Sequence, residues 1–379
     1  MPKGLYIHIP FCDHICTYCD FPKLVTKGQQ HEAYLHALIE ELKYYEQKIG
    51  FKDLQTIYIG GGTPTALSVL QLDLLFHYLN EAIIFDQLQE ISIEANPENL
   101  TSSKIEYLLK QGITRISLGV QTFNEPLLKQ IGRKHGNEHV IHAIKQLKES
   151  GMQNINLDLI YGIPGQTYDQ VQKDLEMAIK LEVPHISAYS LIVEEHTPLY
   201  LAYMKDKLTL TDHDLEAQMC ELVMETLAQN GFQQYEISNF TKAEPSRHNL
   251  SYWLNEEYIG AGLGAHGYVS GSRYHNSRSI NAYIKKVRNG DLPIVDSHVL
   301  SLKEKLEEEM FLGLRLLKGV NIKAVNLKYG VQIEELYKQA LHHSMKCGYL
   351  ELKDGWISLT KSGILMANEV FEQFLLGVE

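Results

Sequence analysis

The chain has 379 residues, which predicts two domains or one large domain with an appendage rather than a single small module. Lys and Arg number 35 against 47 Asp and Glu, and this net charge of −12 argues against nucleic acid as the main partner. Hydrophobic residues make up 44% of the chain, as in soluble globular proteins, and no apolar run is long enough for a membrane span. The first residues lead straight into a strand-like run, with no signal peptide. We therefore expect a cytoplasmic protein.

Short β-type runs alternate with helical patterns over the first two hundred residues. The runs are almost continuously apolar and rich in β-branched residues, as strands buried on both faces require. Each helical segment is long enough for a crossover between parallel strands. The pattern predicts an α/β fold, a (β/α) barrel or partial barrel within residues 1–210. Its strands are expected at 5–9, 56–59, 90–94, 115–120, 155–160 and 185–191, and its helices at 31–49, 68–84, 102–110, 138–149 and 168–181.

The pattern changes after residue 210. Residues 211–300 are expected to form a bridging segment, with a helix near 210–229, a strand near 235–240 and then a stretch rich in Tyr, Trp, His and Gly. Residues 301–379 predict a small C-terminal domain with the element order of a winged helix. Its predicted elements are helices at 302–317, 332–346 and 361–375, and a hairpin that turns at Asp354 and Gly355.

Chemically active residue types follow five consecutive predicted strands at their carboxyl ends. In a (β/α) barrel these ends meet on one face, where the functional loops gather. The residues in question are the cysteine loop after the first strand, Gly60–Pro64 after the second, Glu94 at the end of the third, Gln121 after the fourth and Asp158 on the fifth. The convergence predicts one site at this face.

Three of the five cysteines lie within eight residues, in a C-x3-C-x2-C spacing formed by Cys12, Cys16 and Cys19. Three thiolates on one short loop suit three irons of a [4Fe-4S] cluster and leave the fourth iron open to another ligand. The alternative is a structural zinc ion completed by His8 or His14. The other two cysteines, Cys220 and Cys347, are expected to be small buried hydrophobic residues.

Four segments together resemble a known family. They are Tyr6–Cys12, the cysteine loop with Tyr18, Gly60–Thr65 and Asp158–Thr167. In this order they resemble the radical SAM enzymes of the oxygen-independent coproporphyrinogen III oxidase group, from Tyr6 to the C-terminal domain. The resemblance implies a radical SAM partial (β/α)6 barrel, a [4Fe-4S] cluster on the three cysteines and bound S-adenosylmethionine (SAM). It implies SAM contacts from Tyr6, Tyr18, Gly61, Gly62, Thr63, Glu94, Gln121, Arg133 and Asp158.

These residue types suit a ligand with an amine, a carboxylate and ribose hydroxyls. Glu94 and Asp158 can accept hydrogen bonds from amine or hydroxyl groups, and Arg133 can bind a carboxylate through a charge-assisted pair. Gly61 and Gly62 lack side chains, so backbone carbonyls there can approach the methionyl amine closely.

Two departures from the oxidases of this group bear on function. The oxidases carry a fourth cysteine two positions after the third, where this chain has Phe21, and they have a longer arm before the position of Tyr6. Residues 247–253 instead match the H-N-x-x-Y-W signature of the HemW-type heme chaperones. The resemblance therefore implies a heme-binding protein that hands heme to acceptor proteins. The alternative is an oxidase that decarboxylates coproporphyrinogen III, and enzymatic activity is left open, as is a homodimer.

The signature places the expected heme contact at His248. Imidazole is a common axial ligand of heme, and the neighbouring Tyr252, Trp253 and Arg247 could contact the macrocycle and a propionate. The alternative is that His248 and Asn249 form ordinary hydrogen bonds within the fold.

Overall fold

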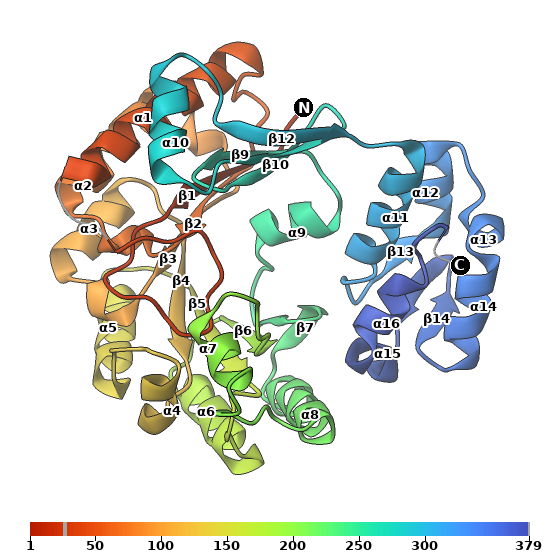
Figure 1. Ribbon diagram of the computed structural model, residues 1–379. Helices are drawn as coiled ribbons and strands as arrows, with labels where there is room; N and C mark the ends of the chain where they lie inside the picture. The colour runs from red at the N-terminus through yellow and green to blue at the C-terminus, as the bar shows by residue number, and fades with distance from the viewer. Residues whose placement is uncertain (26–28, 378–379) are drawn as a thin grey trace.

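The computed structural model describes residues 1–25 and 29–377 (Figure 1). A twelve-stranded sheet dominates it, in the order β12-β11-β10-β9-β1-β2-β3-β4-β5-β6-β8-β7. Strands β1 to β6 pair in parallel and in sequence, and they curve into an open barrel. Helices α1 to α6 cover the outer face of this curve (Figure 1). The predicted α/β class and partial (β/α)6 barrel are confirmed.

The predicted strands and helices of the barrel all lie within two residues of their observed bounds. The strands are β1 (Gly4–Ile9), β2 (Thr56–Gly61), β3 (Glu90–Ala95), β4 (Arg115–Gln121), β5 (Asn154–Tyr161) and β6 (His185–Ser190). The helices are α1 (Gln29–Lys48), α2 (Val69–Ala82), α3 (Ser102–Lys110), α4 (Glu125–Gln130), α5 (Asn137–Glu149) and α6 (Tyr168–Lys180). Short 3-10 turns at Pro64–Ala66, Phe85–Gln87 and Pro97–Asn99 follow or precede the strands.

Local sequence explains where helix α6 begins and which way the side chains of β1 face. Helix α6 starts at a capping box, in which Thr167 and Gln170 exchange side-chain and backbone hydrogen bonds. In β1 the apolar residues Leu5, Ile7 and Ile9 alternate with polar ones and are fully buried. Because side chains alternate along a strand, the apolar row packs under the helices and the polar row faces the barrel interior.

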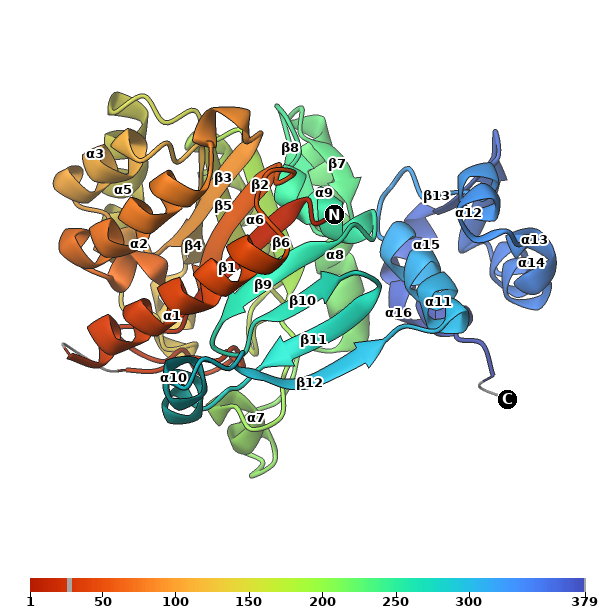
Figure 2. The ribbon, with the colours of Figure 1, turned by 90° about the horizontal axis from the view of Figure 1, so that it is seen from above.

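Residues after 210 extend the sheet at both ends. At the β6 end, β7 (Gln233–Glu236) and β8 (Asn239–Thr241) form an antiparallel pair, so the single strand expected at 235–240 is wrong. At the other end, β9 pairs in parallel with β1, and β10 to β12 follow antiparallel (Figure 2). Their bounds are β9 (Tyr258–Gly262), β10 (His266–Val269), β11 (Ser272–Asn276) and β12 (Ile294–Val299), with helices α7 (Pro198–Tyr203), α8 (His213–Gln229), α9 (Arg247–Trp253) and α10 (Ile280–Arg288) between strands.

The C-terminal domain combines helices with a three-stranded sheet of order β13-β15-β14. The hairpin turns at Asp354 and Gly355 as predicted. The expected long helices are shorter or broken. The elements are α11 (Leu302–Gly313), β13 (Val320–Asn321), α12 (Ile322–Tyr329), α13 (Ile333–Leu336), α14 (Lys338–Lys346), β14 (Leu350–Lys353), β15 (Trp356–Leu359), α15 (Lys361–Leu365) and α16 (Ala367–Glu372).

Tertiary contacts account for two of these breaks. After α11 the chain leaves the helix because residues 315 and 317 form backbone hydrogen bonds with Ile237 and Tyr235 beside β7. Between α13 and α14 the chain turns at Tyr337, whose buried ring packs edge-on against Phe374. The periodicity of the sequence continues through both positions, so the breaks were not predicted.

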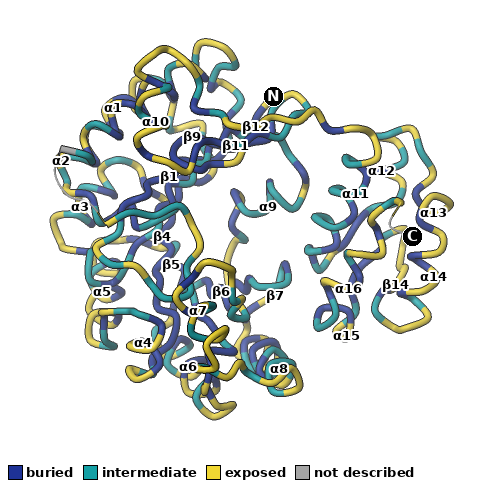
Figure 3. Tube along the Cα trace, in the orientation of Figure 1, coloured by how far each residue is buried: buried dark blue, intermediate teal, exposed yellow. Residues whose placement is uncertain are grey.

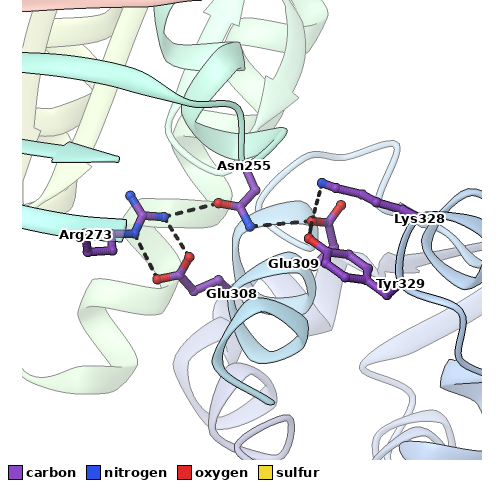
Figure 4. A network of polar contacts seen from close by, with 6 residues as sticks. All are labelled: Asn255, Arg273, Glu308, Glu309, Lys328 and Tyr329. Carbon is purple, nitrogen blue, oxygen red and sulfur yellow. Dashed lines mark hydrogen bonds and ion pairs between the residues drawn. The ribbon is translucent and has the colours of Figure 1, made fainter. Parts of the chain in front are cut away.

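A polar network joins the C-terminal domain to the barrel (Figure 4). Arg273 on β11 forms two hydrogen bonds with Glu308 on α11, at 2.8 and 3.0 Å, and a third with the carbonyl oxygen of the Asn255 side chain. Asn255 follows α9 and reaches Glu309 of α11 at 3.5 Å. Helix α9 is thereby held between the barrel and the C-terminal domain (Figures 1 and 4). Glu309 also accepts from Lys328 and Tyr329.

None of the helices in residues 1–25 and 29–377 combines the length and apolar character needed to cross a bilayer.

Candidate functional site

A cavity of about 400 Å³ opens at the carboxyl ends of β1 to β6. This is the face at which a parallel barrel gathers its functional loops. The structure brings eleven of the thirteen predicted site residues into the wall of this one cavity. They are Cys12, Cys16, Tyr18, Cys19, Gly61, Gly62, Thr63, Glu94, Gln121, Arg133 and Asp158.

Backbone hydrogen bonds hold the cysteine loop at the mouth of the cavity. The amide of Cys12 donates to the carbonyl of Leu24, and the amide of Thr17 donates to the carbonyl of Ile131 after α4. Burial raises the pKa of the Cys12 thiol to about 11, although the nearby Thr63 hydroxyl opposes the shift. A thiol buried in this way becomes a thiolate readily only if a cation or metal centre compensates its charge.

The donor set fits an iron-sulfur cluster. All three loop thiols line the same cavity, and thiolates are the ordinary ligands of iron in such clusters. Within the described residues, no three His, Cys, Asp or Glu side chains are placed to hold a single metal ion. A cubane needs its three protein thiolates on three separate irons.

The glycines after β2 leave room beside the cysteine loop. A Cβ atom at Gly62 would lie 2.9 Å from the Cys12 sulfur and 2.9 Å from the Phe11 carbonyl oxygen. Gly61 has a φ of +117°, and a Cβ there would lie 2.6 Å from the ring of His8. Any side chain at either position would therefore displace the cysteine loop or the neighbouring strand.

Two partly buried carboxylates face the cavity from β3 and β5. Glu94 accepts hydrogen bonds from the Tyr58 hydroxyl at 2.8 Å and the Gly61 amide at 3.0 Å. Asp158 accepts from Ser117 and from the Asn156 amide. Burial raises the pKa of Glu94 to about 7 and also raises the pKa of Asp158. Because a cation favours ionised carboxylates, both groups would bind a positively charged ligand more strongly than a neutral one.

Arg133 and Gln121 complete the upper wall. Arg133 donates to the Asn96 side-chain oxygen at 2.7 Å and to the Tyr18 hydroxyl at 2.9 Å, whereas its buried Nε has no partner among the described residues. Gln121 has a φ of +71° at a break in the β4–β5 register that begins at Gly119. Left-handed backbone at a residue with a side chain is a strained feature often found at functional sites.

Tyr6 does not line the cavity. Its hydroxyl bonds to His8 Nδ1 at 2.9 Å, and its ring stacks on that of Tyr58. Tyr6 therefore supports Tyr58, which in turn holds Glu94. The predicted contact between Tyr6 and SAM stays a prediction.

The structure also places His248 outside the cavity, on α9 beneath the floor. Its side chain is 0% exposed, and both ring nitrogens are hydrogen-bonded, Nδ1 to Thr56 Oγ1 and Nε2 to the Tyr252 hydroxyl, each at 2.8 Å. Burial lowers the pKa of His248 to about 3, so the ring is neutral at physiological pH. The adjacent Asn249 lines the cavity floor. Figure 3 shows α9 in both buried and intermediate colours, and its buried residues are His248 and Ser251.

Several polar residues on the inner wall were not predicted from the sequence. Arg115 at the start of β4, Asn156 on β5 and Ser187 on β6 all line the cavity. Their only signal was a polar residue at every second position of an otherwise apolar strand. The prediction for Cys347 was wrong, because the side chain is exposed on the C-terminal domain, and Cys220 is only partly buried.

Comparison with known proteins agrees with this architecture. Residues 6–178 match the model of the radical SAM superfamily, and residues 300–366 match that of the HemN C-terminal domain. The solved structure of coproporphyrinogen III oxidase HemN from Escherichia coli, a radical SAM enzyme, superposes with a TM-score of 0.85. It shares 22% identity over 99% of this chain and 90% of that chain. The fold and the cysteine site define a member of the radical SAM superfamily.

Full-length relatives narrow the class. The heme chaperone HemW of Bacillus subtilis is 43% identical over 98% of this chain and 99% of its own length. Heme chaperone HemW of Lactococcus lactis is also 43% identical, and that of Escherichia coli is 32% identical. Both alignments cover 99% of this chain and 98% of the relative. The chain belongs to the HemW family.

Proposed function

We propose that this protein is a heme chaperone that carries a [4Fe-4S] cluster on Cys12, Cys16 and Cys19, binds SAM beside it and passes heme to acceptor proteins. The observation that carries the cofactor part is the single cavity shared by the three thiols, the glycine run and the carboxylates of Glu94 and Asp158. The names of the full-length relatives support the heme part. The same proposal includes a cytoplasmic location and leaves open a homodimer.

The cavity supplies a complementary partner for each end of SAM. Glu94 and Asp158 accept from its amine or ribose hydroxyls, and the unpaired Nε of Arg133 is free to meet its carboxylate. Gly61 and Gly62 keep the space between the cysteine loop and β2 open. A bound cluster would supply electron transfer next to the sulfonium, which is the chemistry typical of this superfamily.

Phe21 favours a chaperone over a porphyrinogen oxidase. It occupies the position of the fourth cysteine of the oxidases, is 61% exposed and lines the mouth of the cavity. An apolar ring there cannot ligate a metal, and it offers a surface on which a macrocycle could pack. Anaerobic incubation with reduced cluster, SAM and coproporphyrinogen III should yield no protoporphyrinogen. Sustained decarboxylation would overturn the chaperone proposal in favour of the oxidase.

His248 needs a conformational change before it can ligate heme. Nε2 is hydrogen-bonded to the Tyr252 hydroxyl, so iron can approach that nitrogen only after this bond is broken. We therefore expect α9 to move when heme binds. The motif and the buried state of His248 are compatible only if heme binding and exposure of α9 occur together.

An anaerobic heme titration of three variants tests this directly. His248→Ala should lose heme affinity, whereas Tyr252→Phe should keep it or bind more tightly, because the competing hydroxyl is gone. Thr56→Val is the matched control, since it removes a bond to the other nitrogen without freeing Nε2. Equal heme affinity in wild type and His248→Ala would reject His248 as the ligand. Absence of heme binding by the wild type, with or without reconstituted cluster, would reject the chaperone proposal itself.

A further inference from the structure

The floor of the cavity contains a buried cation with no direct ion-pair partner among the described residues. Arg115 is 2% exposed and lines the cavity. Among the described residues it forms no ion pair, its Nε has no partner, and its one side-chain hydrogen bond is a long 3.4 Å contact with His185 Nδ1. Guanidinium groups have five N–H donors, and burying one with most of them unused is costly unless a ligand supplies acceptors.

We propose that Arg115 binds the carboxylate of a second ligand, on the cavity floor beneath the residues assigned to SAM. The inference rests on the proposed function only in taking the upper part of the cavity as the SAM site. Arg115 lies two residues before Ser117 on β4, and Ser117 is in register with Glu94, so the backbone of Arg115 is roughly 7 Å below that of Glu94. A ligand on the floor would therefore lie below SAM rather than replace it.

The neighbours of Arg115 leave it as the cation available for this role. Burial keeps the pKa of His185 well below its ordinary value, so this ring is neutral. Asn156 and Ser187 already use their groups on one another, on His185, and on Asp158, Ser117 and Asn239. Asn249 reaches the floor from α9, and no hydrogen bond to its side-chain amide occurs within the described residues. Its NH2 group is a second donor for the carboxylate.

The acidic neighbours limit the charge of the ligand. Glu94 and Asp158 face the same cavity, and Arg115 lowers the pKa of each against the larger effect of burial. A doubly charged phosphate would add two negative charges to a space with one free guanidinium. A carboxylate adds one negative charge, and its two oxygens can accept two parallel hydrogen bonds from a guanidinium.

Two sources supply this chemistry, a small organic acid and a propionate arm of a tetrapyrrole. The test uses protein with reconstituted cluster and added SAM, and it compares wild type, Arg115→Gln, Arg115→Lys and Arg288→Gln. Arg288 is exposed on α10 and controls for loss of one positive charge. Succinate and glutarate are titrated by calorimetry beside their dimethyl esters. Heme and heme dimethyl ester are titrated by absorbance.

We expect at least one free acid to bind wild type and Arg288→Gln, with about tenfold or greater loss of affinity in Arg115→Gln. The affinity of Arg115→Lys for the free acid should lie between those of wild type and Arg115→Gln. Lysine keeps the positive charge but cannot form the two parallel hydrogen bonds of a guanidinium. The esters should bind wild type as weakly as the acids bind Arg115→Gln. An effect confined to heme assigns a propionate, and an effect on the small acids assigns an organic acid. Either supports the inference.

Three outcomes separate this inference from the proposed function. If neither small acid binds the wild type and heme binds Arg115→Gln like the wild type, the inference is wrong while heme binding through His248 stands. The same holds if Arg115→Gln binds every free acid like the wild type. If small acids bind through Arg115 but heme does not bind at all, the chaperone proposal fails and the inference stands. The melting temperature controls for folding, because free acid should raise it in wild type and not in Arg115→Gln.

Discussion

The cysteine cavity and helix α9 lie on either side of the cavity floor. They differ in whether the nitrogen atoms of their buried side chains have hydrogen-bond partners. In the cavity, buried nitrogen atoms of His14, Arg115 and Arg133 have no partner among the described residues. On α9, His248 uses both ring nitrogens, and the helix start is held by Glu90, which accepts from the amides of residues 247 and 248. The unpaired donors in the cavity can meet a ligand, whereas the paired ring of His248 stabilises the fold, although Trp253 Nε1 on the same helix is also buried without a partner among the described residues.

This contrast shows that a motif does not reveal whether its residues are accessible. Both the C-x3-C-x2-C loop and the H-N-x-x-Y-W segment carry recognisable residue types. The first opens into a cavity, and in the second only Asn249 does. Changes on the two sides should therefore differ: those in the cavity should remove binding of the cluster or SAM, and those at His248 should change stability as well as heme affinity.

The largest expected effect is loss of the cluster. Cys16→Ala should abolish bound iron and acid-labile sulfide almost completely, because two thiolates do not retain a cubane that has only three protein ligands. Cys347→Ala is the matched control, since that thiol is exposed on the C-terminal domain. Iron and sulfide analysis after anaerobic reconstitution checks the result. Full cluster occupancy in Cys16→Ala would remove this cysteine from the ligand set.

The next effect concerns SAM. Arg133→Gln should weaken SAM binding by about tenfold or more, because a charge-assisted hydrogen bond contributes roughly 1.5–3 kcal/mol. Exposed Lys134 provides the control Lys134→Gln, which changes the charge at the neighbouring position. Calorimetric titration of SAM measures both variants. Equal loss in both would indicate a general effect of charge rather than a direct contact.

On α9 the expected effect is on the pH dependence of stability. His248 has a folded-state pKa of about 3, below the ordinary 6.5, so the unfolded chain binds more protons between these values. The stability contributed by the neutral ring is complete above pH 6.5 and is lost as pH falls towards 3. Between pH 7 and pH 5 the wild type should lose about 2 kcal/mol more unfolding free energy than His248→Gln.

Urea unfolding of both proteins at pH 7, 6 and 5 measures this difference. Gln keeps a polar side chain of similar reach but does not titrate, so the comparison isolates the imidazole from the other buried histidines. Parallel pH profiles for the two proteins would show that His248 is protonated as easily in the folded chain as in the unfolded one.

The smallest effect is expected at the contact between strand β11 and helix α11 of the C-terminal domain. Arg273→Gln removes the two-bond ion pair with Glu308, which is partly buried, and should cost about 1 kcal/mol of stability. Limited proteolysis after residue 299 should become faster in this variant. Lys338→Gln, which breaks an exposed ion pair with Glu335, should leave both measurements unchanged.

The sequence predicted the barrel well because its strands are buried on both faces and read as apolar runs. Strands β9 to β12 escaped detection because they are short and contain Gly, His and Arg, and only pairing with β1 and with one another makes them strands. The division of the chain at residues 210 and 300 stays a prediction. Residues 211–300 supply strands to both ends of the same sheet as residues 1–210.

For the site, residue spacing was enough where ligands lie on one loop, as for Cys12, Cys16 and Cys19. It was not enough for side chains whose direction depends on partners far away in the chain. Tyr6 and His248 are held by His8, Thr56 and Tyr252 rather than by the cavity. Arg115 was overlooked because a polar residue at the start of a strand gives no sign of the face it occupies.

The central position of β1 has a consequence for biosynthesis. One of its edges pairs with β2, which ends at Gly61, and the other pairs with β9, which begins at Tyr258. A chain synthesised from its N-terminus can form the first pairing early, but the second only after about two hundred more residues have emerged. Until then, the strand that carries the cysteine loop has one bare edge. We therefore expect the proposed cluster to be held stably only at a late stage, after β9 has paired with β1.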